Sequence, residues 1–239
     1  MKGFLFPCVA LSAVFVCGLA GAQEEEKAPS PWTHRVVVVN GGATSLTTPH
    51  EIADTDAAQI GYHAATETAP ALWFAFEGSY QKPLTVRMGV PKIESYRLLR
   101  PRMALVAPGL PQPEPPLPFP VPPGYGAIVY DTADQAVSDG RDGFTGTRSW
   151  MFAADTLSPV SAGRAFLVGY LPEGGAGKFW MTVGDETRFR FADLFGVVSK
   201  TVEIRRFHEM SDGFGATVWQ VVTVLGLALV ITLVAVSPK

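Results

Sequence analysis

Residues 161–184 read SAGRAFLVGYLPEGGAGKFWMTVG, and they set the fold class. The stretch contains two apolar runs, residues 165–171 and 178–183, on either side of a glycine-rich turn at residues 172–177. A strand places alternate side chains on opposite faces. Two alternating sets result, Phe166, Val168 and Tyr170 in the first run and Phe179, Met181 and Val183 in the second. The pattern predicts an antiparallel hairpin in which these two sets form one wall of a core.

Short apolar runs separated by turn residues continue upstream of this stretch. They lie at residues 35–39, 71–77, 84–88, 103–107, 125–130 and 149–153. No convincing helical pattern interrupts them before Phe189. Many short strands with Gly and Pro turns are typical of an antiparallel sandwich or jelly roll. We therefore expect a mainly β fold, with one antiparallel β-sandwich over residues 35–190.

The apolar residues change to helical spacing after the last strand. They are Phe191, Leu194, Phe195, Val198 and Val202. This predicts a short amphipathic helix at residues 192–202, followed by a connector through residues 204–207, both within a juxtamembrane region at residues 191–215. Three basic side chains belong to this region, Lys200, Arg205 and Arg206. They would either touch lipid headgroups or form an ordinary solvated face.

Both ends of the chain indicate export and membrane anchoring. Residues 1–22 have a basic start, an apolar centre and small residues before Gln23, which is typical of a signal peptide. Residues 216–236 carry no charge, and at about 1.5 Å of rise per residue they match a bilayer core of about 30 Å. We expect a flexible leader at residues 23–34, a single transmembrane helix, and a short tail at residues 237–239. The ectodomain would lie outside the cytoplasm, in the periplasm or at the cell surface.

Composition removes several classes of function. Cys8 and Cys17 both fall inside the expected signal peptide, so the mature chain would have no disulfide, catalytic thiol or cysteine-bound metal. The formal net charge is −3 and no basic block occurs, so nucleic acid is not an expected partner. The histidines, His34, His50, His63 and His208, are scattered and stand in no HExxH or similar frame. We expect no cofactor and no enzymatic activity, with a hydrolase of unrecognised site as an alternative.

The segment PGLPQPEPPLPFPVPP at residues 108–123 contains nine prolines, and we call it the proline-rich segment. Such a segment favours polyproline II and cannot form a central strand. A ligand of SH3 or WW domains is not favoured outside the cell, so a stiff loop between strands is expected. Its interleaved Leu110, Leu117, Phe119 and Val121 predict that it packs against the sandwich.

Two groups of side chains are candidates for ligand binding. Four aspartates lie within residues 131–142, Asp131, Asp134, Asp139 and Asp142. Calcium prefers such oxygen ligands, but the spacing departs from an EF-hand and aspartates are also common in turns. Four aromatic residues lie on expected strands, Trp73, Trp150, Tyr170 and Trp180. On an exposed face they would bind a sugar or a partner, and on an inward face they would form core; apolar residues on both faces at residues 179–181 indicate a covered face.

The two runs that opened this section resemble the C-terminal hairpin of bacterial pre-peptidase C-terminal-type sandwich modules. That pattern is Gly-x-Tyr-x-Leu-x-Val, a turn, and Gly-x-Tyr-x-Leu-x-Val, and Phe166 stands here where tyrosine is usual. The resemblance extends over about residues 60–183. It implies a jelly-roll-like, non-catalytic module on an exported protein.

Three functions remain open at this level. The first is a membrane-anchored interaction or scaffold subunit that docks on a protein of the membrane or envelope. The second is a surface module that binds carbohydrate or calcium. The third is the hydrolase. Aromatic residues gathered on an exposed face would favour the second over the first, and a buried polar triad in a cleft would favour the third.

Overall fold

The computed structural model describes residues 35–39, 42–77, 83–158, 163–172, 174–186 and 194–211. The expected signal peptide, leader, transmembrane helix and tail lie outside these ranges. Within them, no helix is both long and apolar enough to cross a bilayer.

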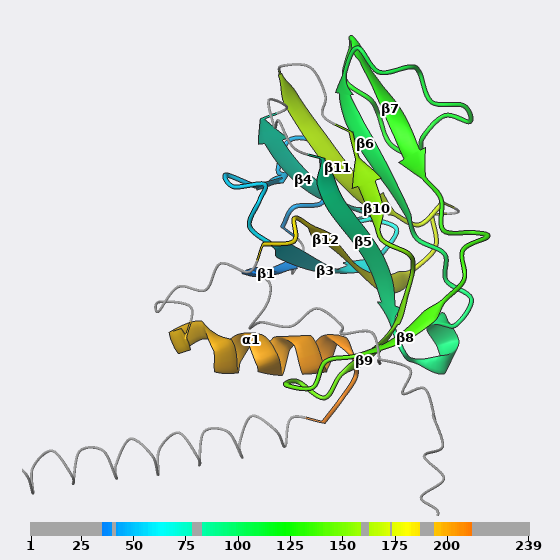
Figure 1. Ribbon diagram of the computed structural model, residues 1–239. Coiled ribbons are helices and arrows are strands. Elements are labelled where there is room, and N and C mark those ends of the chain that lie inside the picture. Colours follow the sequence, from blue (N-terminus) through cyan, green and yellow to red (C-terminus); the bar gives the residue numbers. More distant parts are fainter. Residues whose placement is uncertain are drawn as a thin grey trace, which may run out of the picture.

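The described residues form two sheets (Figure 1). The seven-stranded sheet contains, in spatial order, β1 (Arg35–Val39), β3 (Gln59–Ala65), β12 (Gly177–Val183), β5 (Leu84–Pro91), β9 (Arg148–Met151) and β8 (Ser138–Arg141), with β10 (Asp155–Leu157) also paired to β5. The five-stranded sheet contains β2 (His50–Glu51), β4 (Ala71–Glu77), β11 (Arg164–Tyr170), β6 (Arg102–Pro108) and β7 (Tyr125–Tyr130). A 3-10 turn, η1 (Glu94–Tyr96), and one helix, α1 (Leu194–Phe207), complete the set. Pairing is antiparallel except for β1 with β3 and β2 with β4, so the expected mainly β, antiparallel-rich architecture is confirmed.

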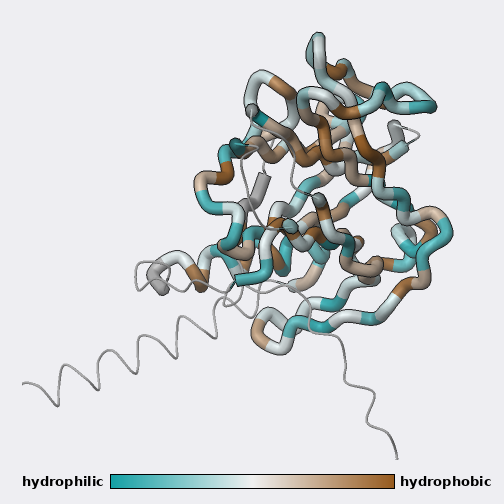
Figure 2. Tube along the Cα trace, turned by 45° about the horizontal axis from the view of Figure 1, so that its top comes forward, coloured by the Kyte–Doolittle hydropathy of each residue, from teal (hydrophilic) through white to brown (hydrophobic). Residues whose placement is uncertain are grey.

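The main core lies between the two sheets. Leu72, Phe74 and Leu167 of the five-stranded sheet belong to the same buried cluster as Met88 and Phe179 of the seven-stranded sheet. Figure 2 shows hydrophobic stretches along the central strands and hydrophilic residues in the loops around the rim. Burial of this apolar surface is the main stabilising contribution, at about 25 cal/mol per Å².

The outer face of each sheet is covered as well. Trp73, Val168 and Tyr170 point away from the main core into a second cluster, against which Phe119 of the proline-rich segment packs. On the other sheet a third cluster places Trp180 against α1; its members are Val36, Ile60, Tyr62, Met151, Trp180 and Ile204. The expected cover over residues 179–181 is therefore α1, which lies below β1 and β3 in Figure 1. Because both faces are covered, β11 and β12 are apolar almost throughout.

The predicted hairpin of β11 with β12 is wrong. β11 pairs with β4 and β6, whereas β12 pairs with β3 and β5 in the other sheet. The connection at residues 171–176 crosses from one sheet to the other. Phe179 and Met181 do face the main core, but Phe166 and Val168 face the outer cluster, and Leu167 is the residue of β11 that faces inward.

The helix is longer than predicted. α1 continues through residues 204–207, which were expected to form a connector. Ile204 explains the extension, because it is fully buried against the sheet and must be presented at helical spacing. The helix ends in a Schellman motif: the N–H of Met210 donates to the carbonyl of Arg205 (2.8 Å), and that of Glu209 to the carbonyl of Arg206 (2.9 Å). Glu209 adopts φ 58°, the left-handed conformation that this motif requires.

Candidate functional site

The proline-rich segment is fixed to the outer face of the five-stranded sheet by an aromatic contact. The ring of Phe119 lies 5.0 Å from that of Trp73 and 5.3 Å from that of Tyr170, both edge-on. Leu117 and Val121 pack against the same buried cluster. Edge-to-face aromatic pairs contribute about 0.5–1.5 kcal/mol beyond the area that they bury. The expectation that this segment packs on the sandwich is thus confirmed.

Hydrogen bonds to edge strand β7 hold the start of the segment. The N–H of Ala127 donates to the carbonyl of Pro111 (2.8 Å), and the side-chain Nε2 of Gln112 donates to the carbonyl of Tyr125 (2.7 Å). Proline has no N–H to donate, so the amide of Gln112 provides the donor that the neighbouring prolines lack. A Cβ at Gly126 would lie 2.0 Å from the carbonyl oxygen of Leu110, so only glycine permits this close approach.

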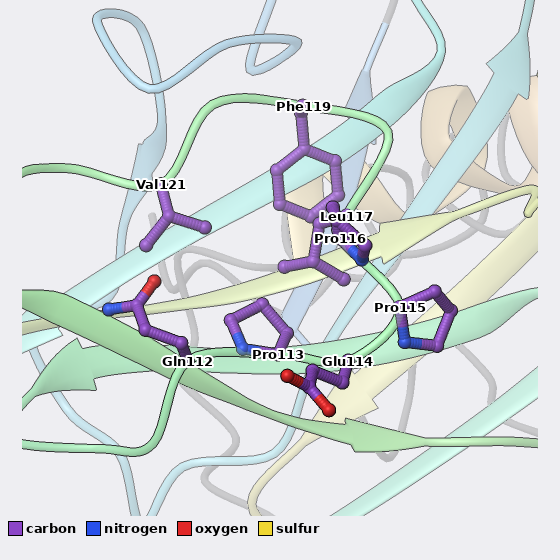
Figure 3. Close-up of a pocket in the computed structure, with 8 residues that line it drawn as sticks. All are labelled: Gln112, Pro113, Glu114, Pro115, Pro116, Leu117, Phe119 and Val121. Atoms are coloured by element: carbon purple, nitrogen blue, oxygen red, sulfur yellow. The ribbon is translucent and has the colours of Figure 1, made fainter.

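The fixed segment makes a U-turn around a hollow of about 720 Å³. Figure 3 shows residues 112–115 along one arm and residues 119–121 along the other, with their side chains around the space between. The lining consists of Gln112, Pro113, Glu114, Pro115, Pro116, Leu117, Phe119 and Val121. Among these lining residues Glu114 is the one titratable group. The arrangement offers rigid apolar contact with one carboxylate, and it contains no pair of groups for acid–base chemistry.

Edge strand β7 carries two exposed apolar residues. β7 is the edge strand of the five-stranded sheet, and its Ile128 and Val129 are 38% and 37% exposed. Exposed apolar residues on a sheet edge are unusual unless the edge is covered by another element. The two residues lie on opposite faces: Val129 is paired with Ala104 of the outer cluster, on the face that carries the proline-rich segment, whereas Ile128 is paired with Leu105 of the main core.

The aromatic residues predicted as a binding surface do not share an exposed face. Trp73 and Tyr170 come together beneath Phe119, and both are buried. Trp180 is buried on the opposite sheet under α1. Trp150 packs, partly buried, against the main core. The structure therefore uses these rings as core, the alternative that the sequence left open.

The four aspartates predicted as calcium ligands do not form one site, and three of them make separate local contacts. Asp131 pairs with Arg102 (2.7 Å), and Asp139 pairs with both Lys92 and Arg148. Asp142 is buried, and accepts the N–H of Phe144 and the hydroxyl of Thr145, both at 2.8 Å. Asp134 is exposed. Across the described ranges, no three His, Cys, Asp or Glu side chains gather closely enough to hold a metal ion.

These ion pairs shift the carboxylates toward the charged form. Partial desolvation raises the pKa of Asp139, but the hydrogen bonds and charges of Lys92 and Arg148 outweigh it and hold that pKa below its ordinary value. Partial desolvation also raises the pKa of Asp131, but the hydrogen bond and charge of Arg102 outweigh it and hold that pKa below its ordinary value. Both carboxylates are already neutralised by neighbouring cations.

The basic residues predicted to lie near the membrane are all on α1, but they differ in role. Arg205 is half-buried and donates through Nη1 to the carbonyl of Thr145 (2.6 Å) and through Nη2 to that of Ser211 (3.3 Å). It therefore ties α1 to the β8–β9 turn. Arg206 is exposed and Lys200 is partly exposed.

A buried polar network under α1 was not predicted. The indole Nε1 of Trp180 donates to Ser149 Oγ (3.1 Å), which lies 3.2 Å from His208 Nε2. His208 Nδ1 lies 2.8 Å from the carbonyl of Ile204, so Nδ1 is the donor and Nε2 accepts from the serine. Burial lowers the pKa of His208 to about 4, which keeps the ring neutral.

This network resembles the first half of a catalytic triad, but its geometry is structural. A backbone carbonyl stands where a triad would have a carboxylate. Ser149 is 3% exposed, and its oxygen already accepts from Trp180. No signal in the sequence could have found the network, because its members are distant in the chain and lie in no motif.

The sequence matches no protein-family model, and it has no significant match among curated proteins.

Proposed function

We propose that this chain is a non-catalytic, membrane-anchored, extracytoplasmic β-sandwich protein that acts as an interaction or assembly module. The observation that carries the proposal is the hollow in the proline-rich segment, with the exposed Val129 on the same face of the sheet. Its occupant would be an extended, apolar segment of a partner protein in the membrane or envelope. Such a segment would place apolar side chains in the hollow and against Val129.

The rigidity of the surface supports a binding role. Proline has one fixed backbone dihedral, and the bonds of Ala127 and Gln112 already hold the segment on the sheet. A partner would therefore order few new side chains, which lowers the entropic cost of association. Glu114 would favour a partner with a basic residue beside its apolar ones.

Anchoring and export rest on the sequence. The apolar residues 216–236 and the signal-like residues 1–22 would hold the sandwich at the outer side of a membrane. The resemblance to pre-peptidase C-terminal-type modules is one of sequence alone, since the two runs that carry it lie in different sheets and do not form a hairpin.

A crosslinking experiment tests the docking surface. A photoreactive amino acid replaces Glu114 in the full chain, expressed in the membranes of its own cells, and crosslinked species are identified by mass spectrometry. We expect one recurrent partner that disappears when Val129 is also changed to Asp. A probe at Glu94 is the control, because this residue lies on η1 and does not line the hollow. Equal products from both probe positions, or none from position 114, would contradict the proposal.

A further inference from the structure

A second hollow, of about 320 Å³, lies at the end of the five-stranded sheet where β6 begins and β7 and β11 end. Its walls include Leu98, Leu99, Leu171, Arg100, Arg102 and Asp131. It is separate from the hollow of the proline-rich segment and shares no lining residue with it. Its volume lies at the small end of the range for ligand pockets.

One positive charge in this pocket has no carboxylate partner in the described part of the chain. Arg102 is neutralised by Asp131 at 2.7 Å. Among the described residues, no carboxylate forms an ion pair with Arg100, whose Nη1 instead donates to the carbonyls of Arg97 (3.1 Å) and Leu99 (2.9 Å). Its Cζ also lies 5.6 Å from the ring centroid of Phe152. The guanidinium is thus held in a fixed position by groups that do not cancel its charge.

Apart from Arg100 and the Arg102–Asp131 pair, the side chains that line the pocket are apolar. Leu171 is buried at its wall and Leu99 is partly buried. Leu98, at 84% exposed, is the most exposed of the large hydrophobic residues in the described part of the chain. A preorganised guanidinium with no ion-pair partner among the described residues, set beside three leucines, is complementary to a molecule that has an anionic head and an apolar body.

We propose that this pocket binds a small carboxylate that carries an apolar chain or ring. The carboxylate pairs with Arg100, which retains donors beyond its two carbonyl bonds. The apolar body covers Leu98 and contacts Leu99 and Leu171. An inorganic anion would form only the ion pair with Arg100, and a neutral apolar molecule would form only the contacts with the leucines. The pocket therefore favours a molecule that has both a carboxylate and an apolar body.

Ligand-observed ¹⁹F NMR with 3-(4-fluorophenyl)propanoate tests the proposal on the full chain in lipid nanodiscs. Empty nanodiscs correct for partition into lipid, and the corresponding amide lacks the charge. We expect saturable broadening with the carboxylate, and at least about tenfold weaker binding of the amide, because a charge-assisted pair exceeds a neutral one. Saturable binding absent at millimolar ligand, or equal binding of both molecules, would overturn the proposal.

Matched variants locate the site. Arg100→Gln should weaken the carboxylate by about tenfold or more. Arg97→Gln is the matched control, because it removes the same charge three residues away. The side chain of Arg97 is exposed and paired with Glu94, so this variant should leave the affinity unchanged. Leu98→Gln changes an exposed residue that folding does not need, and should weaken binding several-fold. If both arginine variants weakened binding equally, the binding would reflect general electrostatic attraction, and the proposed pocket would be wrong.

Discussion

His208 is kept neutral by its enclosure between α1 and the seven-stranded sheet. Its folded pKa, about 4, lies below the ordinary histidine value of 6.5 because burial disfavours the charged ring. As the pH falls below about 6.5, the unfolded chain takes up a proton that the folded protein does not. Stability is therefore lost between about pH 6.5 and pH 4 and this loss then levels off. At 1.36 kcal/mol per pKa unit, the loss amounts to roughly 3 kcal/mol.

Replacing this histidine should flatten the acid dependence of stability. We expect His208→Gln to lower stability at pH 7.5, since the bonds to Ser149 and Ile204 are disturbed, yet to lose less between pH 7.5 and pH 4.5 than the parent chain. His63, also buried with a lowered pKa, contributes in the same direction. Urea unfolding at both pH values measures the difference. His50→Gln, on the two-residue strand β2, is the control, and an unchanged slope in His208→Gln would refute the assignment.

Single residues also explain why β3, the longest of the strands that were not predicted, escaped the sequence analysis. β3 has the sequence QIGYHAA, in which Gln59, Gly61 and His63 stand where alternation would place apolar residues. Gly61 faces the main core because a Cβ there would lie 2.6 Å from the ring of Phe74. Gln59 and His63 are buried but bond to the carbonyls of Asp54 and Ala69. At Gly61 the space in the core is occupied by the ring of Phe74 from the opposite sheet, not by a side chain of β3. The alternation of apolar residues that would reveal a strand is therefore missing from this sequence.

At the scale of elements, β11 and β12 show what alternation can and cannot specify. It correctly predicted the strands and the sharing of faces within each. It could not predict the sheet to which each belongs, because six connecting residues can close a hairpin or cross a sandwich. The absence of polar residues from both faces was the informative signal, since it indicated central strands covered on each side.

Aspartate substitutions in β11 distinguish the two arrangements. If β11 and β12 formed the predicted hairpin, with one face in the core and the other in solvent, Val168→Asp would unfold the protein. Leu167→Asp would then destabilise it less. Both residues are fully buried, Val168 beneath the proline-rich segment and Leu167 in the main core. We expect both substitutions to abolish folding, because each buries an unpaired charge. Ile128→Asp, at an exposed edge position, should be tolerated; soluble yield and thermal melting provide the readout, and a stable Leu167→Asp would contradict the sandwich topology.

The proline-rich segment depends on one glycine. In Gly126→Ala the new methyl group would meet the backbone of Leu110 and Pro111, which cannot move without losing the bond from Ala127. We expect the segment to lift from the sheet, with a red-shifted emission of Trp73 and a loss of about 1–3 kcal/mol. Gly143→Ala meets nothing within 4 Å and is the matched control. Identical spectra for both variants would show that the segment is not held at this point.

At the scale of the whole molecule, four layers stand in series: the proline-rich segment, the five-stranded sheet, the seven-stranded sheet and α1. α1 ends at Phe207, shortly before the residues proposed as a membrane helix. The proposed binding surface lies on the first layer, at the opposite end of the series from α1. In the proposed arrangement the side of the sandwich with α1 is tethered and the docking side is left accessible.

Protease protection tests this orientation. Trypsin added to intact spheroplasts should reach Arg97 and Arg206, which are exposed, while a fragment containing residues 216–236 should remain in the membrane. Detergent-solubilised chain is the control for accessibility. Full protection of the chain in sealed spheroplasts would refute an extracytoplasmic sandwich.

The crossing from β11 to β12 has a consequence for how this protein is made. β3 pairs with β12, and β4 pairs with β11. Each sheet therefore lacks a central strand until more than half of the chain has been synthesised. Such high contact order slows folding and leaves early strands without their neighbours. A ribosome-bound chain that ends before residue 164 would lack a central strand in both layers. We expect the sandwich to stay incomplete through most of synthesis, which would suit the proposed export because a secretory translocon threads an unfolded chain.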